Sequence, residues 1–263
     1  MYTMGIDVGS ASSKAVILRD GKEVVAGLAV QAGTGSSGPG RVLKEIAAQS
    51  GLTLEDMSFI LATGYGRTAL PMADKQMSEI ICHGKGVFFQ DPSVRTVIDI
   101  GGQDVKAIAL DDRGGIRQFY MNDKCAAGTG RFLEVMARVL EVPLEEMAEY
   151  HFRSRNPAQV SSTCTVFAES EVISLLSRGT AKEDIIAGVH FSVAAKACAL
   201  AQRVGARREV VLCGGAAKNG GVADAIEKEL GEPLAVAQNP QLTGALGAAL
   251  LAYEEMMRKE RSA

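Results

Sequence analysis

Residues 6–18 carry the pattern that decides the fold. They read Ile6-Asp7-Val8-Gly9-Ser10-Ala11-Ser12-Ser13-Lys14-Ala15-Val16-Ile17-Leu18. The pattern returns 92 residues later (98 − 6 = 92) as Ile98-Asp99-Ile100-Gly101-Gly102-Gln103-Asp104-Val105-Lys106-Ala107-Ile108-Ala109-Leu110. Six of the 13 aligned positions are identical and two more exchange Val for Ile. We therefore interpret the two stretches as a duplicated structural unit.

Each copy predicts a β-hairpin with a phosphate-binding turn. An Asp-Gly or Gly-Gly turn follows each second strand, at 20–21 and 111–115, which is typical of hairpins. A glycine in the first turn lets the backbone approach a ligand, and successive N–H groups there form an anion-binding concavity. Structural hairpins with solvated Asp residues are the alternative for either copy alone, but the matched pair favours nucleotide binding. The candidate donors are Gly9, Ser10, Ser12, Ser13, Gly101 and Gln103, with Asp7 and Asp99 as Mg²⁺ ligands.

Two further glycine segments have a strand before them. Gly214-Gly215-Ala216-Ala217-Lys218-Asn219 follows the expected strand 209–213, and such a glycine pair lets a base or ribose lie on the backbone. A plain strand-to-helix turn is the equal alternative. Gly33–Gly38 matches G-x-G-x-x-G between an expected strand, 24–30, and an expected helix, 41–49. That strand belongs to an antiparallel hairpin, which argues against a dinucleotide fingerprint.

The rest of the chain alternates between strand and helix patterns. We expect residues 59–67 to run from a strand into a loop, a helix at 74–86 and a Gly/Ala-rich helix at 242–257. Two lobes, each opening with a hairpin, are the expected organisation. Lobe I takes residues 1–95 and 240–263, and lobe II takes residues 96–239.

Composition limits the classes of function. The chain has 263 residues, 47% hydrophobic and 22% charged, with a net charge of −3, which excludes disorder as the main state. The absence of a basic block argues against nucleic-acid binding. Residues 242–252, among the longest apolar runs, contain Gly and fall short of a membrane span. We expect a cytoplasmic protein with no membrane partner, whose five cysteines are reduced thiols, metal ligands or core residues.

Two cysteines stand at expected helix starts. Cys125 precedes an amphipathic helix that includes Phe132 and Leu140, and Cys164 precedes one that includes Val172 and Leu176. This position favours a thiolate or an anionic metal–sulfur cluster. Spacing alone favours the alternative of two unrelated turn cysteines. Two thiolates also cannot ligate a [4Fe–4S] cluster unless a symmetric dimer supplies two from each chain.

The chain resembles the ATP-dependent activators of 2-hydroxyacyl-CoA dehydratases, relatives of the ATPase subunits of benzoyl-CoA reductases. The resemblance extends over essentially the whole chain. The residues that carry it are Gly5–Ser10, Ala62–Arg67, Val97–Asp104, Asn122–Gly130 and Ser161–Glu171.

The resemblance implies an α/β, two-lobed actin/Hsp70/sugar kinase-like ATPase fold with duplicated phosphate hairpins. It implies a homodimer with one intersubunit [4Fe–4S] cluster, ligated by Cys125 and Cys164 of each chain. ATP, Mg²⁺ and later ADP would lie between the lobes. An electron from ferredoxin or flavodoxin would pass to the dehydratase, component D. In this arrangement Lys14 and Gly102 join the phosphate ligands, Asp104 or Gln103 positions the attacking water, and Gly214, Gly215 and Lys218 border the adenosine.

Three other functions remain open at this point. A sugar-type kinase of the same superfamily would need no cluster. An actin-like or chaperone-like module would use ATP only as a switch. An NAD-binding protein would use the Gly33–Gly38 loop. Iron analysis, polymer formation and cofactor titration, respectively, discriminate these from the activator. The resemblance leaves the identity of the hydroxyacyl-CoA undetermined.

Overall fold

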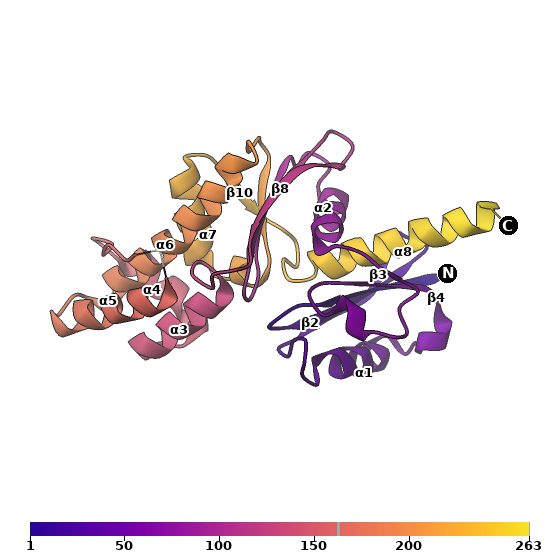
Figure 1. The fold of residues 1–263 in the computed structure, drawn as a ribbon, viewed down its shortest axis with the longest axis horizontal. Helices are drawn as coiled ribbons and strands as arrows, with labels where there is room; N and C mark the ends of the chain where they lie inside the picture. The colour runs from indigo at the N-terminus through magenta and orange to yellow at the C-terminus, as the bar shows by residue number, and fades with distance from the viewer. Residues whose placement is uncertain (162–163, 263) are drawn as a thin grey trace. The chain divides into compact units, whose positions relative to one another are not determined.

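The chain divides into two compact units. The computed structural model describes residues 1–161 and 164–262. Unit 1 comprises Met1–Arg95, Leu110–Arg117 and Ala237–Ala263, and unit 2 comprises Thr96–Ala109 and Gln118–Val236 (Figure 1). Each sheet has five strands and contains both parallel and antiparallel pairs, so the fold class is α/β.

Unit 1 is built on a sheet with the strand order β3-β2-β1-β4-β5. Strands β1, β2 and β3 are consecutive antiparallel neighbours, while β4 runs parallel to β1 and β5 parallel to β4. The elements are β1 (Tyr2–Val8), β2 (Ser13–Arg19), β3 (Glu23–Val30), α1 (Gly38–Ser50), β4 (Met57–Thr63), β5 (Lys75–Gln76), α2 (Glu79–Gln90) and α8 (Thr243–Ser262).

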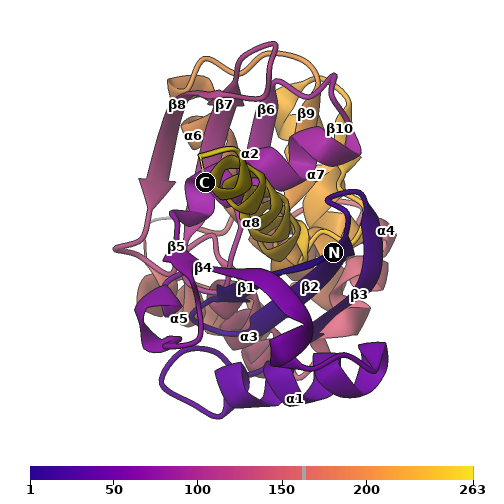
Figure 2. The ribbon, with the colours of Figure 1, turned by 90° about the vertical axis from the view of Figure 1, so that its right-hand side faces the viewer.

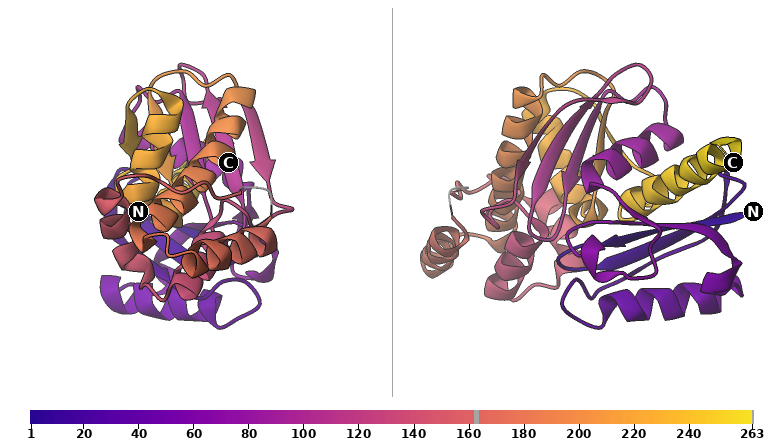
Figure 3. Two further views of the ribbon diagram at one scale, coloured as in Figure 1. Left: turned by 90° about the vertical axis from the view of Figure 1, so that its left-hand side faces the viewer. Right: turned by 45° about the vertical axis from the view of Figure 1, so that its right-hand side comes forward.

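Both faces of this sheet are covered, α1 lying on one and α8 on the other (Figure 3, right). Successive residues of a strand point to opposite faces, and β2 shows it. Ala15 and Ile17 belong to the cluster that contains Val42 of α1. Val16 and Leu18 belong to the cluster that contains Ala245, Leu246, Ala249 and Leu250 of α8. Burial on both faces explains why β2 reads as a continuous apolar run.

Helix α8 lies close to its neighbours because glycines stand at the contacts. A Cβ on Gly5 of β1 would overlap the carbonyl oxygen of Ala245, and one on Gly247 would overlap that of Cys82 in α2. The helix predicted from the Gly/Ala-rich pattern at 242–257 is confirmed as α8. The buried first half of α8 forms the surface that packs on these neighbours.

Unit 2 repeats the sheet of unit 1 strand for strand. Its order is β10-β9-β6-β7-β8 (Figure 2), so β6 to β10 take the places of β1 to β5. The register repeats as well, because Asp7 pairs with Lys14 and Asp99 pairs with Lys106. The predicted duplication is confirmed. The strands are β6 (Thr96–Ile100), β7 (Val105–Leu110), β8 (Ile116–Asn122), β9 (Val210–Cys213) and β10 (Leu234–Val236).

The helices of unit 2 share one apolar core with its sheet. Ile98 and Ile100 of β6, Phe132 of α3 and Val189 of α6 are fully buried members of this core. Helix α6 is long and apolar enough to cross a membrane by length and composition, but 72% of its most apolar window is buried inside the protein. The helices are α3 (Gly130–Leu140), α4 (Met147–Arg153), α5 (Thr165–Ser177), α6 (Lys182–Arg203) and α7 (Gly220–Leu230).

The helix expected at 74–86 begins later than predicted. Residues 75–76 form β5, and α2 runs from Glu79 to Gln90. The backbone N–H of Met77 donates to the carbonyl of Ala62 in β4, so pairing with the sheet outweighs the local helical pattern. Ser78 then caps α2, its hydroxyl accepting from the N–H of Ile80 at 3.3 Å.

Candidate functional site

The first hairpin places a buried ion pair at the carboxyl end of β1. Lys14 Nζ lies 3.2 Å from Asp7 Oδ2, and the Asp7 side chain is only 6% exposed. The turn between them closes through a hydrogen bond from the N–H of Gly9 to the carbonyl of Ser12, at 3.0 Å. Lys14 therefore balances the charge of a carboxylate that the fold removes from bulk water.

Two glycine loops brace this turn from within unit 1. The N–H of Thr34 donates to the carbonyl of Gly9 at 2.9 Å, and that of Gly66 donates to the carbonyl of Val8 at 2.8 Å. A Cβ on Gly33 would overlap the carbonyl oxygen of Ser10. The Gly33–Gly38 loop thus supports the hairpin, and it follows a strand that is antiparallel to β2, as the sequence indicated.

The serines of the first turn differ in their surroundings. Ser13 is fully buried, and its hydroxyl donates to the carbonyl of Ala32 at 2.8 Å. Its single proton is therefore already engaged within the unit. Ser10 is half-buried and Ser12 is 8% exposed. Of the three predicted donors, Ser13 is the one whose hydroxyl stabilises the loop itself.

The second hairpin surrounds its lysine with two carboxylates. Lys106 Nζ lies 3.0 Å from Asp99 Oδ2 and 2.8 Å from Asp104 Oδ1. Burial opposes the charge of this ammonium, but attraction to Asp99 and Asp104 outweighs burial and raises the pKa of Lys106 above its ordinary value. Lys106 is therefore a permanent cation within this part of unit 2.

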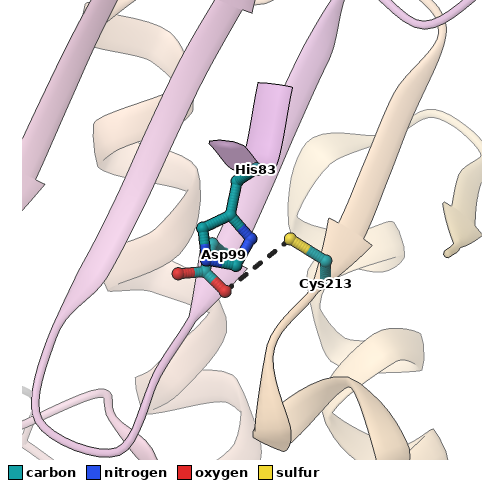
Figure 4. A group of neighbouring side chains, drawn as sticks. All are labelled: His83, Asp99 and Cys213. Atoms are coloured by element: carbon teal, nitrogen blue, oxygen red, sulfur yellow. Dashed lines mark hydrogen bonds between the residues drawn. The ribbon is translucent and has the colours of Figure 1, made fainter. Parts of the chain in front are cut away.

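Asp99 also receives a hydrogen bond from the neighbouring strand. The thiol of Cys213, at the end of β9, donates to Asp99 Oδ1 at 3.6 Å (Figure 4). Strands β6 and β9 are parallel and pair Asp99 with Cys213, so both strand ends reach the same edge of the sheet. Gly214 follows with φ of +88°, and a Cβ there would crowd Asp99 Oδ1. The structure thus brings residues 214–219 beside the second hairpin, with Gly215 and Lys218 exposed.

The turn of the second hairpin is joined to helix α3. The N–H groups of Gly130 and Arg131 donate to the carbonyls of Gly101 and Gly102, each at 2.9 Å. These are the first two residues of α3, whose N–H groups have no partner within the helix. Gln103 is exposed in the same turn. The second hairpin and the start of α3 therefore form one hydrogen-bonded piece of unit 2.

The five cysteines fall into two groups. Cys82, Cys198 and Cys213 are buried in the core, as predicted, and burial raises the pKa of the first two thiols to about 12. Cys125 and Cys164 are half-buried. Cys164 is the N-cap of α5, as expected, whereas four residues separate Cys125 from the first residue of α3. The neighbouring positions 162 and 163 of the predicted motif lie outside the described residues.

One neighbour of Cys125, Lys196, was not predicted from the sequence. Lys196 of α6 donates a hydrogen bond from Nζ to Cys125 Sγ at 3.7 Å. The signal was a single charged residue within the small, apolar stretch 193–200, Val-Ala-Ala-Lys-Ala-Cys-Ala-Leu. A charge on the buried side of a helix usually has a polar partner.

Comparison with known proteins shows relatives over the whole chain. The chain is 63% identical over 259 residues to the activator of lactoyl-CoA dehydratase from Anaerotignum propionicum, covering 98% of this chain and 100% of that protein. It is 56% identical over 256 residues to the (R)-2-hydroxyglutaryl-CoA dehydratase activating ATPase of Acidaminococcus fermentans, covering 97% and 98%. These relatives confirm the resemblance drawn from the sequence.

Solved structures confirm the expected fold. The activator of the 2-hydroxyisocaproyl-CoA dehydratase from Clostridium difficile, with bound ADPNP, superposes with a TM-score of 0.96 at 50% identity, covering 100% of this chain and 98% of that one. A glucokinase of the ROK family from Streptomyces griseus has a TM-score of 0.58 at 14% identity, over 97% and 100%, which shows the sugar kinase-type fold alone. The model of the BadF/BadG/BcrA/BcrD ATPase family matches residues 4–252. The chain belongs to this ATPase family.

Proposed function

We propose that the protein is an ATP-dependent activator that passes single electrons to a 2-hydroxyacyl-CoA dehydratase. The names of its relatives, a lactoyl-CoA dehydratase activator and a 2-hydroxyglutaryl-CoA dehydratase activating ATPase, support this partner. We further propose that it acts as a cytoplasmic homodimer and takes electrons from ferredoxin or flavodoxin. The lobes would be residues 1–95 with 240–263, and residues 96–239.

The two hairpins would hold the phosphates of ATP. Their turn N–H groups at Gly9, Ser10, Gly101 and Gly102 would donate to phosphate oxygens, with further donors from the side chains of the turns. Lys14 and Lys106 would lend positive charge while remaining paired with Asp7 and Asp99. The further candidate donors are the side chains of Ser10, Ser12 and Gln103, whereas the hydroxyl of Ser13 donates to the carbonyl of Ala32.

The carboxylates of the hairpins would serve Mg²⁺ and water. Asp7 and Asp99 lie at equivalent strand ends, and carboxylates there suit Mg²⁺ bound through its water ligands. Asp104 or Gln103 would position the attacking water, and Gln103 is the exposed residue of the two. Gly214, Gly215 and Lys218 would border the adenosine.

The two half-buried cysteines would hold the iron–sulfur group. Cys125 and Cys164 suit it because the other three thiols are buried in the core and because a loop and a helix N-cap leave backbone N–H groups near sulfur. Two such thiols supply half of a four-cysteine set, and a second copy of the chain would supply the rest. When bound, the cluster accepts and releases one electron.

The observation that carries this proposal is the connection between the second hairpin and α3. The carbonyls of Gly101 and Gly102 accept hydrogen bonds from the first N–H groups of α3, and only four residues separate Cys125 from the start of that helix. A movement of the hairpin on phosphate binding would therefore move the start of α3 and the Cys125 segment with it. ATP would favour one arrangement by its differential affinity for it.

Metal analysis and mass measurement test the proposal. Protein purified without oxygen should contain about four iron and four sulfide per dimer. Cys125→Ala and Cys164→Ala should each lose the iron while still binding ATP. The matched control is Cys198→Ala, which removes a buried thiol and should keep the iron. Asp99→Asn should hydrolyse ATP far more slowly with iron unchanged. A colourless, monomeric parent protein would refute the redox role.

A further inference from the structure

Lys196 occupies an unusual position for a lysine. It lies on α6, the central helix of unit 2, and Val193 and Leu200 on the same side are buried in the core. The side chain is half-buried. Within the described residues, 1–161 and 164–262, it forms no ion pair with a carboxylate, and its ammonium instead donates to Cys125 Sγ at 3.7 Å. A half-buried cation without a carboxylate points to an anionic group at the sulfur.

The loop before α3 fixes the direction of this side chain. Gly128 has φ of +86°, which favours glycine. A Cβ there would lie 3.0 Å from Lys196 Cδ and 3.1 Å from Lys196 Cβ. The backbone of the loop therefore packs directly on the lysine stem. Little freedom remains for the stem, and the ammonium stays beside Cys125 rather than extending into solvent.

We propose that Lys196 is a positioning residue that raises the reduction potential of the group held by Cys125. This inference rests on the proposed function, in which Cys125 binds the cluster. On reduction the donor, a reduced ferredoxin or flavodoxin, loses one electron and the cluster gains one negative charge. A neighbouring ammonium stabilises that added charge more than the oxidised form. Hydrogen bonds to cluster sulfur act in the same direction.

The test is a potential measured on anaerobic, iron-loaded protein. Lys196→Met keeps most of the stem and removes the charge. We expect its iron content to equal that of the parent, while its reduction equilibrium falls about tenfold, a midpoint about 59 mV lower for a one-electron couple. Midpoints come from dithionite titrations followed by electron paramagnetic resonance. Lys196→Arg keeps the positive charge and should restore most of the difference.

Lys182→Met is the matched control. Lys182 lies on the same helix, but its Nζ donates to the carbonyl of Leu140 at 2.7 Å, so its loss should leave the midpoint unchanged. An unchanged midpoint in Lys196→Met would overturn the inference and leave the proposed function intact. If Lys196→Met loses iron, Lys196→Gln is titrated instead, and iron loss in both neutral variants also overturns the inference. A parent protein without iron would overturn the proposed function itself.

Discussion

Acid should destabilise unit 2 through His190, a fully buried residue of α6. Burial, with a smaller contribution from the neighbouring His151, lowers the pKa of His190 to about 3 from its ordinary 6.5. The two rings lie 5.0 Å apart, and Asn219 Nδ2 lies 3.2 Å from His190 Nε2. A neutral imidazole accepts that hydrogen bond, whereas an imidazolium has only donors.

The sign and size of the effect follow from proton linkage. Between pH 3 and pH 6.5 the unfolded chain binds a proton at this histidine and the folded chain does not, so stability decreases as the pH falls. The contribution of the neutral, buried His190 to the free energy of unfolding is fully present above pH 6.5. At 1.36 kcal/mol per pH unit, going from pH 7 to pH 5 removes about 2 kcal/mol of unfolding free energy.

The assay compares the parent with His190→Gln, in which the side-chain oxygen of Gln can still accept from Asn219. Urea unfolding is followed by far-ultraviolet circular dichroism at pH 7 and pH 5, because the chain contains no Trp. Other groups titrate in both proteins, so the quantity of interest is the difference between their pH dependences. The variant should lose about 2 kcal/mol less than the parent. Equal losses in the two proteins would refute the assignment.

Three glycine substitutions give further predictions. Gly33→Ala should push the backbone of Ser10 and weaken ATP binding about tenfold, equal to about 1.4 kcal/mol, with the iron content unchanged. Isothermal titration calorimetry measures the ATP affinity, and an unaltered affinity would show that the Gly33–Gly38 loop does not support the hairpin turn. Gly130→Ala places a Cβ 3.2 Å from the carbonyl oxygen of Gly101 and should lower the electrons transferred per ATP hydrolysed, read from paired hydrolysis and dye-reduction assays. An unchanged ratio would separate α3 from the hairpin. Gly5→Ala should overpack the contact with α8 and lower unfolding free energy by about 3 kcal/mol or more in urea titrations, and parent-like stability would show that the helix can shift.

Much of the fold was predictable because the duplication is visible in the sequence. The shared spacing of Asp and Lys predicted two hairpins, and both have the same register. The start of the helix expected at 74–86 was wrong because a two-residue strand, β5, pairs with β4, and a strand that short leaves no periodic signal. The cap at Ser78 was present in the sequence, as a serine followed by Glu79.

The candidate site was predictable in its residue types but not in its contacts. Asp99, Cys213 and Gly214 meet because β6 and β9 are adjacent, which depends on the order of strands in the sheet. The bond between Lys196 and Cys125 joins residues 71 apart in the chain. Ser13 looked like a phosphate donor by analogy with its neighbours, but its hydroxyl donates to Ala32. Such contacts come from packing between distant segments, which local patterns do not encode.

The return of α8 to the first sheet has a consequence for synthesis on the ribosome. Strands β1, β2 and β4 emerge early, yet the helix that covers one of their faces consists of residues 243–262. Until those residues leave the exit tunnel, Val16, Leu18 and Leu61 face water. During that interval the nascent chain exposes an apolar sheet surface that can associate with other molecules. Unit 2, whose segments end at Val236, has its full sequence available before unit 1 does.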